Sequence, residues 1–143
     1  MPEPHDIRAL VGLLSAAQRA LQATERDALA EHGLTPGVYR LLDHVYDRPG
    51  VAPAAAAATL GVARPTVTGW IIALDERGLL ARLDVLTDGR RATLEPTPDG
   101  RRVVAEARDL IRRRQNRLLS GAIDPVEQAA LLDVLQRIAT AGS

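Results

Sequence analysis

The chain has 143 residues, 46% of them hydrophobic, which suits one domain with a substantial core. Its 18 basic and 18 acidic residues cancel, which excludes a polybasic tail but leaves room for a local basic patch. There is no cysteine, so disulfides, cysteine-bound zinc and thiol redox chemistry are excluded. No apolar run is long enough to span a bilayer, and the N-terminus lacks a basic signal region. We therefore expect a cytoplasmic protein that makes no membrane contact.

Proline after a polar residue marks three helix starts, because proline needs no hydrogen-bond partner there and the polar oxygen caps the helix. These pairs are Thr35-Pro36, Thr97-Pro98 and Asp124-Pro125. In chain order, the hydrophobic periodicity predicts helices at about 6–32, 36–48, 53–60, 64–77, 98–120 and 125–140, and short strands at 80–85 and 91–95. The dipeptide Asp88-Gly89, between the strands, favours a tight hairpin turn.

This order of elements predicts the fold class. A short helix, a turn at Gly61 and a second helix indicate a helix-turn-helix, and the hairpin that follows makes it a winged one. We expect a mainly α-helical single domain over residues 1–143. Its winged helix-turn-helix region would span 34–97, and its helical dimerisation region 1–33 and 98–143.

The second helix of this motif has an outward face suited to DNA. It carries small residues, short hydroxyls and one guanidinium, which let a helix enter the major groove and bond to phosphates or base edges. The predicted contacts are Arg64, Pro65, Thr66, Thr68 and Gly69. A plain helical corner that exposes polar residues is the alternative for this segment alone.

The hairpin carries a second set of candidates. Arg90 and Arg91 follow the Asp88-Gly89 turn, and an arginine-bearing hairpin can reach a phosphate or a narrow minor groove. The alternative is a solvated strand end. Together, the helix and the hairpin favour a DNA-binding module over either alternative.

Nearly the whole chain resembles the MarR family of winged-helix regulators. The resemblance rests on short motifs at matching places: Leu60-Gly61-Val62, Arg64-Pro65-Thr66-Val67-Thr68, the run from Leu74 to Arg82, Asp88-Gly89-Arg90-Arg91 and Thr97-Pro98-Asp99-Gly100. It implies a homodimer that binds a palindromic operator in double-stranded DNA and usually represses. It also implies that the second helix enters the major groove and a wing arginine the minor groove.

Several positions depart from the family pattern. Residues 52 and 63 are alanines (Ala52 and Ala63), whereas the family usually has a capping Ser or Thr at these places. Gly69 replaces a residue that is often longer or basic. Each lost cap costs about 0.5–2 kcal/mol of local helix stability. These changes keep a rival interpretation open, in which a winged-helix protein-interaction module has lost DNA binding.

Apolar stripes on the first helix and the last two lie outside the winged-helix region, and a single chain would leave them partly exposed. They predict a homodimer, with packing against the chain's own core as the alternative. The family resemblance also suggests a small-molecule effector near Tyr39, His44 and Trp70, although ordinary packing explains the same residues. We predict no metal site, cofactor or enzymatic activity, because the sequence shows neither ligand spacing nor a nucleophile–base motif.

Overall fold

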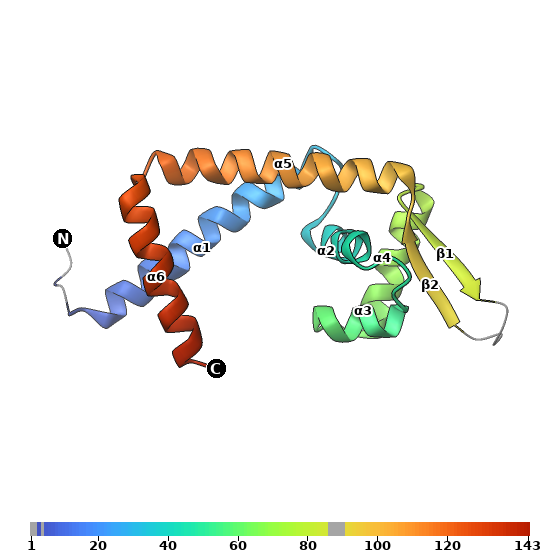
Figure 1. Cartoon of the computed structure of the whole chain (residues 1–143), viewed down its shortest axis with the longest axis horizontal. Helices are drawn as coiled ribbons and strands as arrows, with labels where there is room; N and C mark the ends of the chain where they lie inside the picture. Colours follow the sequence, from blue (N-terminus) through green and yellow to red (C-terminus); the bar gives the residue numbers. More distant parts are fainter. Residues whose placement is uncertain (1–2, 4, 86–90) are drawn as a thin grey trace.

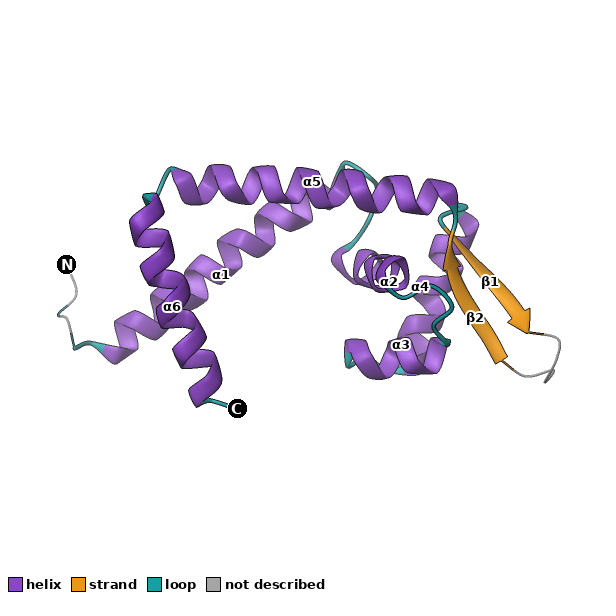
Figure 2. Ribbon diagram, viewed as in Figure 1, coloured by secondary structure: helices purple, strands orange, loops and turns teal. Residues whose placement is uncertain are grey.

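The computed structural model describes residue 3 and residues 5–85 and 91–143. These residues form six α-helices and a two-stranded antiparallel sheet (Figures 1 and 2). In chain order they are α1 (Ile7–Ala30), α2 (Pro36–Asp47), α3 (Pro53–Leu60), α4 (Arg64–Glu76), β1 (Leu80–Val85), β2 (Arg91–Pro96), α5 (Pro98–Ser120) and α6 (Pro125–Ala141). The predicted fold class is confirmed, and the predicted element bounds agree with the observed ones to within two residues.

Side-chain caps explain where three of the helices begin. The hydroxyls of Thr35 and Thr97 accept hydrogen bonds from the backbones of α2 and α5 at 3.5 and 3.0 Å. The carboxylate of Asp124 accepts from Glu127 N at 2.8 Å, while the Glu127 carboxylate accepts from Asp124 N at 2.9 Å. This reciprocal pair is the predicted capping box. Helices α3 and α4 begin after Ala52 and Ala63 without any side-chain cap.

A glycine makes the turn between α3 and α4. Gly61 has φ +67°, in the left-handed region that other residues enter only at a cost, and its neighbour Val62 N donates to Ala57 O at 3.1 Å. The chain therefore leaves α3 at a sharp angle and starts α4 three residues later. This is the helix-turn-helix that the sequence predicts.

The wing is an antiparallel hairpin in which Leu80 pairs with Pro96 and Val85 with Arg91. A third short segment extends it, because Val51 and Leu94 form an isolated bridge, with Leu94 N donating to Val51 O at 2.9 Å. The loop that follows α2 is thereby tied to β2. The expected turn at Asp88-Gly89 lies outside the described residues.

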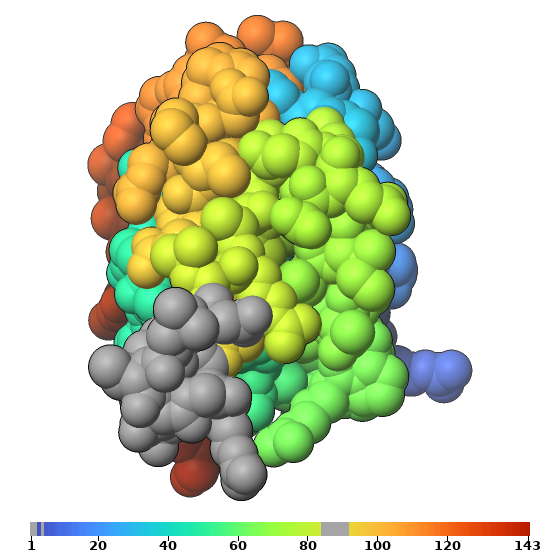
Figure 3. Space-filling model, turned by 90° about the vertical axis from the view of Figure 1, so that its right-hand side faces the viewer, coloured from blue at the N-terminus to red at the C-terminus, as the bar shows by residue number. Residues whose placement is uncertain are grey.

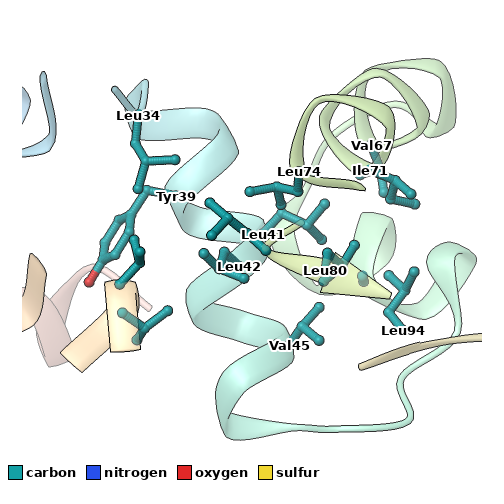
Figure 4. Packing of buried hydrophobic residues seen from close by; sticks show 14 of the residues in the cluster. Leu34, Tyr39, Leu41, Leu42, Val45, Val67, Ile71, Leu74, Leu80 and Leu94 are labelled. Atoms are coloured by element: carbon teal, nitrogen blue, oxygen red, sulfur yellow. The ribbon is translucent and has the colours of Figure 1, made fainter. Parts of the chain in front are cut away.

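Aliphatic side chains fill the core, as the composition predicts (Figure 4). Helix α2 contributes Leu41, Leu42 and Val45, all of them completely buried. Around them pack residues from α4, the sheet and α5, namely Val67, Ile71, Leu74, Leu80, Leu94, Val103, Val104 and Ala107. The core therefore lies within the winged-helix region, the first half of α5 and the C-terminal end of α1, where Leu29 is fully buried.

At the end of the molecule away from the sheet, the helices are largely exposed. Helix α5 runs along the molecule, with the C-terminal part of α1 packed against it, and α6 turns away at its far end (Figure 1). No residue of α6 is buried. The N-terminal half of α1 likewise exposes Ile7, Leu10, Val11 and Leu13.

Gly100, in the first turn of α5, lies at a close contact between α5 and the start of the wing. An added Cβ would lie 1.9 Å from the carbonyl oxygen of Leu79, so Gly100→Ala should lower the free energy of unfolding by about 1–3 kcal/mol. Gly69→Ala in α4 is the matched control, because its Cβ meets nothing within 4 Å. That control should gain up to about 1 kcal/mol from helix propensity. Chemical denaturation of both variants checks this, and a Gly100→Ala protein as stable as the parent would contradict it.

Candidate nucleic-acid interface

One face of α4 packs into the core, and the opposite face is exposed. Val67, Ile71 and Leu74 point into the core and anchor it. Ala56 and Ala57 of α3 are also buried, and their small side chains let the two helices cross closely. The opposite face of α4 is consequently held at a fixed angle and exposed to solvent.

All five predicted contact residues lie on the exposed part of α4. They are Arg64, Pro65, Thr66, Thr68 and Gly69. The Thr68 hydroxyl donates to the carbonyl oxygen of Arg64 at 3.0 Å, so its own proton is already used. Ile72, one turn further along, is 53% exposed and was not among the predicted residues.

A hollow of about 440 Å³ lies beside α4, between the start of α3 and strand β2. Its lining is mainly small and aliphatic: Ala52, Pro53, Ala54, Arg64, Val67, Thr68 and Ala92. Figure 3 looks onto this end of the molecule, where α4 (green) lies beside β1 (yellow-green). Helix α4 and the wing therefore belong to one surface.

The wing residues are only partly described. Asp88, Gly89 and Arg90 lie outside the described residues, and for Arg91 only the backbone, paired with Val85, is described. Arg82 of β1 is exposed on the same hairpin. The structure thus places the hairpin next to α4 but leaves the role of each wing arginine as a prediction.

An ionic and aromatic cluster joins α5 to α2. The Arg108 guanidinium donates through Nε to Asp43 Oδ1 at 2.7 Å and through Nη2 to Asp47 Oδ2 at 2.9 Å. It also lies 4.7 Å from the centre of the Tyr46 ring, within cation–π range. The two carboxylates raise the pKa of Arg108, with Asp43 contributing most. The spacing of Asp43 and Asp47, one helical turn apart, was a signal for such a cation, but the sequence did not indicate which one.

The three residues predicted for an effector site separate into different environments. Tyr39 is buried beside the Arg108 cluster and donates to Asp43 Oδ1 at 3.4 Å. Trp70 packs against Gly37, where an added Cβ would lie 2.5 Å from the indole ring. His44 is half-buried, and its Nε2 is a buried atom with no hydrogen-bond partner.

One hollow does include a predicted effector residue. It measures about 370 Å³ between α1, α2 and α5 and is lined by Glu25, Tyr39, Arg108, Ile111, Arg112, Gln115, Asn116 and Leu119. His44 and Trp70 are not part of its lining. Tyr39 is therefore the member of the predicted set that contacts this space.

Most arginines of α5 are engaged in ion pairs. Arg102 pairs with Asp99 and Glu106, and Arg112 and Arg113 pair with Asp109. Arg114 reaches Glu31 at the end of α1. Such exposed pairs contribute little each, so we treat this row as the solvated face of a long helix.

Two features of the described residues bear on other functions. No single helix there is long and apolar enough to cross a membrane; α3 and α4 reach that composition only jointly, across a bend of 115°. Nor do these residues contain a group of three or more histidine or acidic side chains able to hold a metal ion.

The arrangement defines a class of protein: a winged helix-turn-helix domain flanked by long helices. Known proteins share it. The MarR family model matches residues 32–91. A protein of Thauera aromatica, named for transcriptional regulation of the hcr operon, is 29% identical over 83% of this chain and 71% of its own length.

Solved structures agree. A MarR-family transcriptional regulator from Rhodococcus sp. RHA1 is 28% identical, covers 94% of this chain and 96% of its own, and superposes with a TM-score of 0.73. BpsR of Bordetella bronchiseptica, whose DNA binding is regulated by 6-hydroxynicotinic acid, is 24% identical with a TM-score of 0.72, over 92% of this chain and 98% of its own. Over residues 32–91 the chain is therefore similar to the MarR family, and its overall fold is the winged-helix fold of these transcriptional regulators.

The environment of Tyr39 predicts an unusual titration. Burial, and next the charge of Asp43, raise the pKa of its hydroxyl from 10.0 to about 12. Below pH 10 the hydroxyl is protonated in both the folded and the unfolded chain; between pH 10 and 12 the unfolded chain ionises first, so the free energy of unfolding should fall as pH rises. Absorbance titration of Tyr46→Phe, which leaves Tyr39 as the sole tyrosine, checks this. A midpoint near 10 in the folded protein would contradict it.

Proposed function

We propose that this chain acts in the cytoplasm as a homodimeric repressor that binds a palindromic operator and releases it when a small-molecule effector binds. The observation that carries the proposal is the division of the molecule into two ends. A winged helix with a free α4 face lies at one end, and two helices with unpartnered apolar faces lie at the other.

The apolar end supports dimerisation. Helix α6 exposes a row of large aliphatic side chains: Leu131, Leu132, Val134, Leu135 and Ile138. Leu132 is 58% exposed and Ile138 52%, and the start of α1 also exposes large aliphatic side chains. The apolar row along α6 is typical of a protein–protein interface. A second copy of the chain would cover both helices by the same contacts.

The winged-helix end supports operator binding. The guanidinium of Arg64 and the hydroxyl of Thr66 are exposed at the start of α4, where a recognition helix contacts base edges. A two-fold dimer would present two such helices, and half-sites about 34 Å apart would match them on one side of the duplex. Symmetry of the protein then requires a palindromic site.

The hollow between α1, α2 and α5 supports effector control. Its wall includes Arg108, which holds α5 to Asp43 and Asp47 of α2. A molecule bound there would compete for this guanidinium and could shift α2, against which α4 packs. DNA binding by BpsR is regulated by 6-hydroxynicotinic acid, which is the kind of response we propose here.

The dimer is tested by charging the apolar face of α6. Leu131→Asp combined with Leu135→Asp should convert the dimer to a monomer and abolish tight operator binding, because buried carboxylates would face each other across the interface. Ala129→Asp, on the other side of the helix, should leave the dimer intact. Light scattering after size-exclusion chromatography measures the mass. A parent protein that is already monomeric would overturn this part of the proposal.

DNA binding is tested by its dependence on salt. For the unmodified protein, log K on duplex DNA should fall linearly with log salt, by about 0.9 for each phosphate contact. Arg90→Ala with Arg91→Ala should reduce this slope by roughly one to two units for each wing engaged. The matched control is Arg113→Ala with Arg117→Ala, in the last turns of α5. This variant should leave the slope unchanged. A weak, flat curve for the parent would favour the rival interpretation, a protein-interaction module that no longer binds DNA.

A further inference from the structure

The outward face of α4 is unusual for a helix that enters a groove. Pro65, Gly69 and Ile72 follow one another at helical spacing, on the side opposite the buried Val67 and Ile71. All three are exposed, and none can donate or accept a hydrogen bond through its side chain. The centre of the DNA-facing surface is therefore apolar.

The flanks of this face add few polar groups. Thr68 has already given its hydroxyl proton to the Arg64 carbonyl, which leaves its oxygen as an acceptor only. The indole of Trp70 is turned toward Gly37 of α2. From residue 65 to residue 73 the sequence contains no amide and no charged side chain. Thr66 and, at the very start of the helix, Arg64 are the polar side chains that remain free to read bases.

Each base pair demands a particular chemistry in the major groove. Guanine is read best by Arg or Lys, adenine by Asn or Gln, and cytosine by an acceptor. Thymine alone presents a methyl group, which is read by apolar contact. Of these chemistries, the surface formed by Pro65, Gly69 and Ile72 offers only the last.

We infer that the apolar face of α4, formed by Pro65, Gly69 and Ile72, selects its operator by contact with thymine methyl groups. The inference rests on the proposed DNA binding and specifies which bases it selects. Ile72 supplies the large apolar side chain. The fold does not require a glycine at Gly69, because an added Cβ would meet nothing in the protein within 4 Å. The missing side chain instead lets the helix backbone approach the floor of the groove.

The test begins with a duplex selected from a random library by the purified dimer. Each thymidine of the selected half-site is then replaced by deoxyuridine, which removes the methyl group and keeps the base pairing. Affinity should fall about fourfold for each contacted methyl. If replacement at every thymidine leaves the affinity within twofold, the inference is wrong although DNA binding stands. If no duplex is retained at all, the proposed function itself fails.

Protein variants assign the contact to α4. Ile72→Ala should bind the thymidine and deoxyuridine duplexes equally at the position it contacts, so the discrimination disappears there. Leu83→Ala removes a similarly exposed aliphatic side chain from β1 and should keep the discrimination. Gly69→Ala should fold at least as stably as the parent yet bind the selected duplex at least tenfold more weakly. Retained discrimination in Ile72→Ala, together with undiminished binding by Gly69→Ala, would overturn the assignment.

Discussion

Burial of one face of α2 is the constraint on which the rest of this structure depends. Leu41, Leu42 and Val45 are fully buried, and α4, the sheet and α5 all pack around them. The more polar side of the same helix holds Arg108 of α5 through two carboxylates. Because interiors are packed densely, α5 and α4 cannot move relative to each other without displacing α2. The helix thus links the two ends of the molecule mechanically.

Tight packing at the start of α2 continues this link to α4. Gly37 lies so close to the Trp70 ring that no side chain fits between them. A shift of α2 would therefore press on α4 near the middle of its length. By contrast, the starts of α3 and α4 lack side-chain caps, so packing and backbone hydrogen bonds hold these ends without help from a capping side chain. The position of α4 depends on its neighbours more than on its own sequence.

Local signals explain why the element bounds could be predicted and several contacts could not. Proline, capping oxygens and glycine act within a few residues, so Thr97 and Gly61 reveal a helix start and a turn from sequence alone. The pairing of Arg108 with Asp43 joins residues 65 positions apart, and any of several arginines on α5 satisfied the same pattern. The exposed face of α4 was predicted through residue 69. Ile72 was missed because a large aliphatic residue is ordinarily assigned to the core.

The exposed apolar surfaces of α6 and α4 differ in a way that favours different partners. On α6 the large aliphatic residues adjoin one another and none is buried, which gives a broad surface suited to a second protein. On α4 one large side chain stands among a proline, a glycine and short hydroxyls. Such a surface is too narrow and too interrupted for a stable protein interface. It fits a groove about 12 Å wide, in which methyl groups project singly from the edges of the bases.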